Sequence, residues 1–191
     1  MFFSTTAHLH HRTLLPPTAT LADANTVFAN HDTLLHLDPE IVSYTSIDAP
    51  PTSAAEHTNA ETNWYQVTDH MAGLPAGLWD TTIKYNISIT PIENGIRRHV
   101  SATLGLEQES TWVVEEASAA DLEREVAVDG EGKGKRLVLV EDIYITASRV
   151  LMGTVKGKCE SAYPGIHAKW MQHVVEAGKE TTSGKTEQVV V

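Results

Sequence analysis

The feature that most constrains the fold is a long amphipathic stretch near the end of the chain, over residues 152–180. Its apolar residues recur at steps of three and four, which is the spacing of one face of an α-helix. At about 100° per residue, these side chains spread over roughly half the circumference, which is wide for a helix on a flat surface. A curved sheet that wraps around the helix is therefore the expected partner. The stripe consists of Val155, Cys159, Tyr163, Ile166, Trp170, Val174 and Ala177.

Two residues within this stretch need a separate interpretation. Pro164 lacks a backbone donor and crowds the carbonyl of Glu160, so it predicts a kink or break between helical pieces over 152–163 and 166–178. Because the apolar stripe keeps its phase across Pro164, we expect the two pieces to be coaxial or gently angled on one sheet. His167 lies near the middle of the apolar face and is either a core histidine with satisfied hydrogen bonds or a catalytic residue.

Length and charge limit the classes of protein to consider. The 191 residues suit one hydrophobic core, so we expect a single domain over residues 1–180 and a flexible tail over 181–191. The 25 acidic against 14 basic residues give a net charge of -11, which argues against a surface for nucleic acids or anionic membranes.

Other features of the sequence bear on the cellular compartment. Cys159 is the only cysteine, so an intramolecular disulfide is impossible. No stretch approaches the roughly 20 apolar residues of a membrane span, and the N-terminal residues lack the pattern of a signal peptide. We expect a cytoplasmic protein that is a monomer or a homodimer.

Segments with strand character precede the long helix and predict a mainly antiparallel sheet. A proline pair ends the first segment, and two short helices follow, the first opened by a capping box of Thr20 and Asp23. Residues 49–62 and 117–134 are expected to be loops, the second with a frayed helical start and a disordered tip. The strand-like segments are residues 3–9, 41–47, 63–71, 78–92, 96–106, 111–116 and 136–148.

Two histidines, His8 and His10, share one face of the first predicted strand. Together they could bind a metal ion weakly. No acidic or cysteine residue accompanies them in this segment, so a partly exposed strand edge is the favoured interpretation, and we expect no metal site.

The strongest turn signal is Glu93-Asn94-Gly95, which separates two of the strand-like segments. If Asn94 and Gly95 form the loop, three successive cross-strand pairs on one face are apolar and the alternate pairs are polar. That register predicts one core face, with Arg98 on the core side near the turn. The apolar pairs are Ile89 with Val100, Ile87 with Ala102, and Tyr85 with Leu104.

Adjacent carboxylates at Glu141 and Asp142 lie within the last predicted strand. Because successive side chains of a strand point to opposite faces, one of the two must point inward. The alternate residues that share a strand face with Glu141 include more aliphatic side chains than those that share a face with Asp142. We therefore expect Glu141 to point inward and Asp142 outward. A buried carboxylate must be paired, protonated or open to a wet cavity, and Arg98 is the expected partner.

The predicted order of elements resembles the helix-grip fold of the START-like and polyketide-cyclase-like (SRPBCC) superfamily. This resemblance implies an α+β fold, in which a curved antiparallel sheet of about seven strands wraps around the long C-terminal helix, with two short helices after the first strand. More narrowly, the sequence resembles an uncharacterised family of fungal proteins. The matching phrases are "MFFSTTAHLHHRTLLPP", "LDPEIVSY", "LPAGLWDTTIKYNISI", "LVEDI" and "GTVKGKCE".

The superfamily resemblance implies an internal cavity that takes a small apolar ligand. The sequence shows no Ser-His-Asp motif, metal-ligand spacing, phosphate loop or dinucleotide fingerprint, so we expect no cofactor. The catalytic candidates are Glu141, His167 and Arg98, because a buried histidine that faces a buried carboxylate can take acid and base roles. The ligand-binding candidates are Tyr85, Ile87, Val100, Ala102, Trp112, Tyr144, Trp170, Met171 and Val174.

Two functions of different classes remain open at this point. The first is a cofactor-independent cyclase, dehydratase or isomerase of secondary metabolism, acting on a polyketide, terpenoid or lipid-like molecule. The second is a carrier or sensor that encloses a hydrophobic ligand without changing it. A weaker third possibility is an interaction module whose cavity is filled by its own side chains.

Overall fold

Seven strands form one antiparallel sheet, and four helices accompany it in the part of the chain that the structure describes. The structure is a computed structural model, and it describes residues 4–50, 61–70, 82–102, 105–126 and 136–186. In chain order the elements are β1 (Ser4–Leu14), α1 (Leu21–Ala29), α2 (His31–His36), β2 (Ile41–Ile47), β3 (Asn63–His70), β4 (Thr82–Ile92), β5 (Gly95–Ala102), β6 (Leu106–Glu116), α3 (Ala119–Val126), β7 (Leu137–Ser148) and α4 (Arg149–Thr186).

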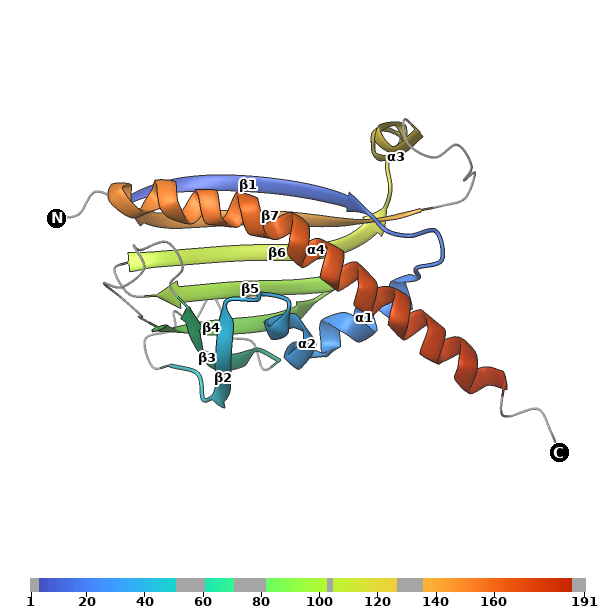
Figure 1. Cartoon of the computed structure of the whole chain (residues 1–191), viewed down its shortest axis with the longest axis horizontal. Coiled ribbons are helices and arrows are strands. Elements are labelled where there is room, and N and C mark those ends of the chain that lie inside the picture. The colour runs from blue at the N-terminus through green and yellow to red at the C-terminus, as the bar shows by residue number, and fades with distance from the viewer. Residues whose placement is uncertain (1–3, 51–60, 71–81, 103–104, 127–135, 187–191) are drawn as a thin grey trace.

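The strands lie in the order β1-β7-β6-β5-β4-β3-β2, so the first and last strands of the chain are neighbours. Figure 1 shows α4 crossing one face of the sheet, with α1 and α2 on the same side. This arrangement confirms the predicted α+β helix-grip architecture with two short helices after the first strand. None of the described helices is long and apolar enough to cross a membrane.

The core lies between α4 and the face of the sheet that it covers, which we call the inner face. Trp170 and Val174 are fully buried, and the ring centroid of Trp170 lies 5.1 Å from that of Phe28 on α1. Burial of side chains of this size contributes about 1.5–3 kcal/mol each to folding. The apolar stripe predicted over residues 152–180 is therefore the docked face of α4. Its earlier members, Val155 and Cys159, are only partly buried.

Of the kink or break predicted at Pro164, the break is wrong, because α4 is a single helix with this proline inside it. Figure 1 shows that the axis of α4 changes direction part-way along. A proline removes one intrahelical hydrogen bond, and a bend accommodates its ring without ending the helix. Burial of Tyr163 and Ile166 on either side favours the continuous helix. The helix also continues through residues 181–186, which were expected to belong to the tail, whereas 187–191 lie outside the described residues.

The predicted register of the β4–β5 hairpin is wrong by two residues. Ile92 pairs with Gly95, so the loop consists of Glu93 and Asn94, and Asn94 takes the left-handed φ of 54°. Gly95 belongs to the strand because a Cβ atom there would lie 1.9 Å from the carbonyl oxygen of Trp112. A shift of two residues preserves the face of every side chain, so the described residues that were predicted to face inward do so, whereas Leu104 lies outside the described residues.

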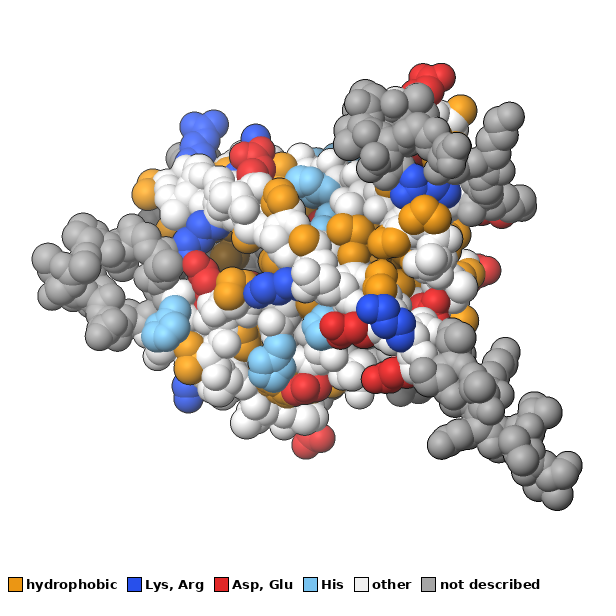
Figure 2. Space-filling view, turned by 45° about the vertical axis from the view of Figure 1, so that its right-hand side comes forward, with side chains coloured by type: hydrophobic (Ala, Val, Ile, Leu, Met, Phe, Trp, Pro, Cys, Tyr) orange, Lys and Arg blue, Asp and Glu red, His pale blue; other side chains and the backbone are white. Residues whose placement is uncertain are grey.

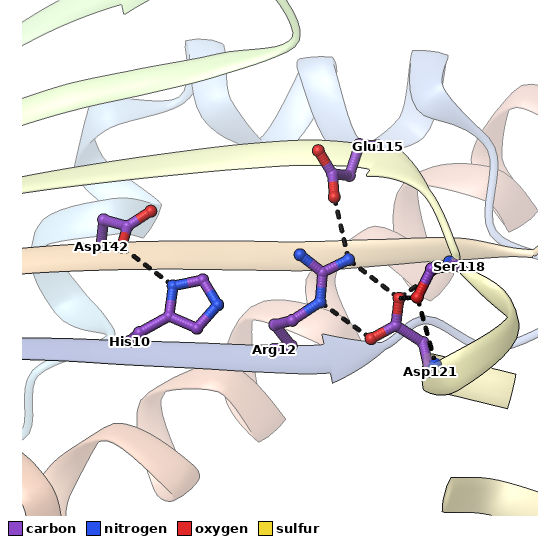
Figure 3. A network of polar contacts seen from close by, with 6 residues as sticks. All are labelled: His10, Arg12, Glu115, Ser118, Asp121 and Asp142. Carbon is purple, nitrogen blue, oxygen red and sulfur yellow. Dashed lines mark hydrogen bonds and ion pairs between the residues drawn. The ribbon is translucent and has the colours of Figure 1, made fainter. Parts of the chain in front are cut away.

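A polar network holds α3 against β1, as Figure 3 shows. Arg12 donates to both carboxylate oxygens of Asp121 at 2.8 Å and to Glu115 at 2.9 Å. Ser118 and Asp121 also form reciprocal hydrogen bonds at the start of the helix. The hydrogen bond from Arg12 holds the pKa of Asp121 well below its usual range. The expected helical start within residues 117–134 is therefore present, and residues 127–135 lie outside the described part.

Candidate functional site

Glu141 points to the inner face and Asp142 to the outer face, as the alternation of β7 predicted. The side chain of Glu141 is 0% exposed. Its Oε2 lies 2.8 Å from Nε2 of His167, and its Oε1 accepts a hydrogen bond of 2.5 Å from the indole of Trp112. The structure thus brings together two of the three predicted catalytic residues, Glu141 and His167.

The second ring nitrogen of His167 is also occupied. Its Nδ1 lies 2.9 Å from Oγ1 of Thr13 on β1, and the imidazole is only 3% exposed. The chain Thr13–His167–Glu141–Trp112 therefore connects β1, α4, β7 and β6. Because both ring nitrogens and both carboxylate oxygens have partners, this geometry favours the core-histidine interpretation of His167.

Arg98 does not pair with Glu141, contrary to the expectation from the sequence. Arg98 on β5 lies opposite Ser110 on β6, which in turn lies opposite Ile143 on β7. One strand therefore separates Arg98 from β7, and a further two residues along β7 separate it from Glu141. His167 and Trp112 take the positions at the carboxylate that were expected for the guanidinium.

Arg98 instead lies at a cavity of about 10 Å³ between α2 and the inner face. This space is large enough for one water molecule. Among the described residues, none forms a hydrogen bond or ion pair with Arg98, and its Nε atom is buried without a partner. Arg98 as a whole is half-buried, and a buried polar atom without a partner is costly, so the Nε atom can accommodate a further partner. The other residues that line the cavity are Leu34, Leu35, Leu37, Ile89, Ile96 and Trp112.

A second polar pair, Asp69 and Tyr85, lies on the inner face of β3 and β4. The hydroxyl of Tyr85 donates to Oδ2 of Asp69 at 3.2 Å, whereas Oδ1 of Asp69 is buried and has no hydrogen-bond partner among the residues that the structure describes. Burial, together with the charges of Asp38 and Glu40, raises the pKa of Asp69 to about 6. The sequence analysis missed Asp69, although it shares the inward parity of Val67 two residues earlier.

Polar groups of β6 and α4 face the same region. Gln108 donates to the hydroxyl of Tyr163 at 3.0 Å, and the thiol of Cys159 lies 3.8 Å from the amide oxygen of Gln108. Burial raises the pKa of Cys159 to about 11, and the charge of Arg98 opposes this increase. Burial also raises the pKa values of Tyr163 and Tyr85, again against the charge of Arg98. The charge of Arg98 therefore acts on the pKa values of groups on both β4 and α4.

The predicted ligand-binding residues divide into three groups. Ile87 and Trp112 belong to the core of the inner face, and Tyr85, Val100 and Met171 pack partly buried against it. Trp170 and Val174 are fully buried between α4, α1 and the sheet, and Ala102 is partly buried in β5. Tyr144 lies on the outer face instead, where it is 52% exposed, because it has the parity of Asp142.

The histidines of the first strand have an acidic partner that the sequence did not reveal. Oδ1 of Asp142 lies 3.0 Å from Nε2 of His8 and 2.9 Å from Nδ1 of His10. Burial acts to raise the pKa of Asp142, but the hydrogen bonds from His10 and His8 hold it below its usual value. Within the described residues, no group of three histidine, cysteine or acidic side chains is arranged to hold a metal ion.

Figure 2 shows a shaded recess in the molecular surface, with hydrophobic side chains at its floor and basic and acidic side chains beside it. An ion pair also lies at the edge of the inner face. Nζ of Lys158 on α4 lies 3.1 Å from Glu40, which immediately precedes β2.

Comparison with solved structures identifies proteins of the same fold. Norcoclaurine synthase from Thalictrum flavum gives a TM-score of 0.57 at 12% identity, covering 91% of this chain and 96% of that one. The same enzyme in complex with dopamine and hydroxybenzaldehyde gives 0.55 at 13% identity, covering 91% and 88%. Zhui aromatase/cyclase from Streptomyces sp. R1128 gives 0.56 at 10% identity, covering 93% and 96%. At such low identity the likeness shows the fold, which is the SRPBCC-like helix-grip fold.

Sequence comparison gives one further result. Residues 4–176 match a family model described as "Domain of unknown function (DUF7053)". No curated protein matches this chain.

Proposed function

The chain belongs to the DUF7053 family, and from that premise we propose that it binds a small apolar molecule against the inner face of its sheet. The ligand lies beneath the N-terminal half of α4, where Val155 and Cys159 are only partly buried, whereas Trp170 further along is fully buried. A polyketide, terpenoid or lipid-like compound has the required chemistry.

The observation that carries this proposal is the Nε atom of Arg98, which is buried among apolar side chains and has no hydrogen-bond partner within the described part of the chain. Arginine presents a rigid fork of donors that matches carboxylate and carbonyl oxygens. A molecule with an apolar body and one such oxygen satisfies Arg98 and covers the apolar surface around it. Small-molecule sites usually combine an apolar lining with a few polar groups in this way.

Catalysis is the second part of the proposal. The protein acts as a cofactor-independent cyclase, dehydratase or isomerase of natural-product metabolism. Support comes from the ionisable pair of Asp69 and Tyr85, which lies on the same inner face as Arg98. Further support comes from the solved structures of similar fold, which include a synthase in complex with two small aromatic molecules and an aromatase/cyclase.

A carrier or sensor without catalytic activity is the alternative. The observation that favours it is the complete hydrogen bonding of Glu141 and His167, which leaves neither residue an atom for a substrate. Mass spectrometry of small molecules that co-purify with the protein separates the two functions. A carrier retains one unchanged ligand, whereas an enzyme incubated with that molecule forms a product.

Binding of dodecanoic acid and of 1-dodecanol, measured by calorimetry, tests the role of Arg98. The substitution Arg98→Met should weaken binding of the acid by about 10- to 100-fold, since a hydrogen bond to a charged group contributes about 1.5–3 kcal/mol. Binding of the alcohol should change by less than about 3-fold. Arg97→Met is the matched control, because Arg97 lies on the outer face of the same strand, 3.7 Å from Glu109. Equal losses for both probes, or none for either, contradict the proposal.

A further inference from the structure

We infer that Asp69, positioned by a hydrogen bond from Tyr85, is a general base that moves a proton at a carbon atom next to a carbonyl group of the bound molecule. This inference rests on the proposed function, because it requires an apolar carbonyl compound on the inner face. It assigns catalysis to a pair of residues outside the buried pair of Glu141 and His167.

The geometry of the two strands sets up the pair. Tyr85 lies opposite Val67, and Asp69 lies two residues further along β3, on the same face of the sheet. The Tyr85 hydroxyl donates a hydrogen bond of 3.2 Å to Oδ2 of Asp69. Within the described residues, Oδ1 is buried and has no partner. A buried polar atom in this state requires an explanation, and a catalytic role is one that the surroundings support.

Charged and titratable groups from several elements face Asp69. Asp38 and Glu40 precede β2, Tyr85 belongs to β4, and Lys158 reaches over from α4 to Glu40. Burial and the two acidic neighbours raise the pKa of Asp69 to about 6, whereas Tyr85 and Lys158 oppose the increase. A general base works best when its pKa is close to the working pH. Asp69 is therefore ionised at neutral pH and is a stronger base than an ordinary carboxylate.

Arg98 supplies the charge that the reaction needs. Its charge lowers the pKa of Tyr85, against the effect of Asp69, and its side chain lies on the same inner face. Oxyanion stabilisation by a preorganised donor is often the largest single contribution to catalysis of this kind.

The proton transfer balances without a further reactant. Oδ1 of Asp69 takes a proton from the carbon next to the carbonyl group, and the electron pair of the C–H bond forms a C=C bond. The carbonyl oxygen becomes an enolate oxygen, which the positive charge of Arg98 stabilises from a distance. The protonated Asp69 then returns its proton to the same carbon or to a conjugated one, which regenerates the carboxylate. The substrate class is therefore an apolar ketone or thioester with an acidic C–H bond.

Deuterium exchange into 2-tetralone, an apolar bicyclic ketone, tests this inference. The full-length protein in D₂O should accelerate the exchange next to the carbonyl group, with a rate that rises with pH and levels off above about 6. Asp69→Asn should slow the catalysed exchange by about 100-fold or more while binding of 2-tetralone changes by less than about 3-fold. Glu109→Gln, an outward-facing acid on β6 with 39% exposure, is the matched control and should leave exchange unchanged.

Tyr85→Phe provides a second readout that does not depend on the stability of the Asp69 variant. The hydrogen bond from Tyr85 lowers the pKa of Asp69, so its loss should move the midpoint of the pH–rate profile upward. Binding of 2-tetralone without catalysed exchange overturns the role of Asp69 as a general base and leaves the proposed function standing. An unchanged pH–rate profile in Tyr85→Phe has the same two consequences. Failure of the wild-type protein to bind 2-tetralone, dodecanoic acid and 1-dodecanol overturns the proposed function, and this inference with it.

Discussion

His167 and Glu141 are 26 positions apart in the sequence, yet Nε2 of the imidazole lies 2.8 Å from Oε2 of the carboxylate where almost no solvent reaches either group. Removal of one member of such a pair leaves the other buried without a partner, which typically costs about 3–5 kcal/mol. His167→Ala should therefore lower the free energy of unfolding by this amount in urea denaturation. His173→Ala, on the same helix with 46% exposure, should change it by less than about 0.5 kcal/mol.

Glu141→Gln separates a structural role of this pair from a catalytic one. The amide keeps the shape of the carboxylate but loses the charge-assisted hydrogen bonds, so we expect a loss of about 1–3 kcal/mol in the free energy of unfolding. A catalytic role for Glu141 predicts a different result, namely turnover reduced by on the order of 100-fold with folding intact. Unchanged stability combined with 100-fold slower exchange of 2-tetralone would support the catalytic role.

Gly95→Ala tests the close approach of β5 to β6. A Cβ atom at Gly95 would lie 1.9 Å from the carbonyl oxygen of Trp112, so one strand must move and the protein should lose about 2–3 kcal/mol of stability. Gly157→Ala is the control, because nothing lies within 4 Å of the new methyl group on α4. That substitution should stabilise the protein by about 0.5–1 kcal/mol. Thermal denaturation of the two variants measures the difference, and equal effects would contradict the structure.

Asp69 should make the protein less stable as the pH rises. Its pKa in the folded protein is about 6 and therefore lies above the unfolded value of about 4, so the folded state binds the proton more tightly. Between about pH 4 and pH 6, the unfolded state loses this proton first, and stability falls. Between pH 4 and pH 7, wild type should lose about 1 kcal/mol more than Asp69→Asn, with allowance for solvent screening of a half-buried group. Parallel pH profiles for the two proteins would exclude this effect.

Asp121 should respond to pH in the opposite direction. Arg12 holds its pKa below the usual range, so the stabilisation is complete above about pH 4 and is lost as the pH falls through the folded pKa. We expect the amides of α3 to exchange faster with solvent at pH 2.5 than at pH 5, after correction for intrinsic rates. In Asp121→Asn they should already exchange fast at pH 5. Protection of α3 in that variant at pH 5 would show that other contacts hold the helix.

Much of the fold could be predicted because its largest signals are local periodicities. The stripe that ends at Ala177 identified the docked face of α4, and alternation identified the inner faces of the strands. The β4–β5 register could not be predicted from the turn alone, since the position of Gly95 depends on Trp112 in a third strand. Pro164 was misleading for a similar reason. The burial that keeps α4 continuous comes from tertiary contacts, which override local propensity.

The candidate site was predicted only in part. Parity placed Glu141 inward, but its actual partner depends on how far α4 slides along the sheet, and no local pattern encodes that. Asp69 was missed because its surroundings come from the segment before β2, from β4 and from α4. The outer partner of His8, Asp142, lies 134 residues away along the chain.

The adjacent carboxylates of β7 have a consequence for the assembly of the sheet. A slip of one residue between β1 and β7 would turn every side chain of β7 to the opposite face. Asp142 would then be buried away from His8 and His10, and Glu141 would lose His167. Two sets of charge contacts would thus fail together with the burial of the aliphatic side chains. The two adjacent carboxylates therefore favour the correct alignment of the first and last strands. This pairing requires the longest loop closure during folding.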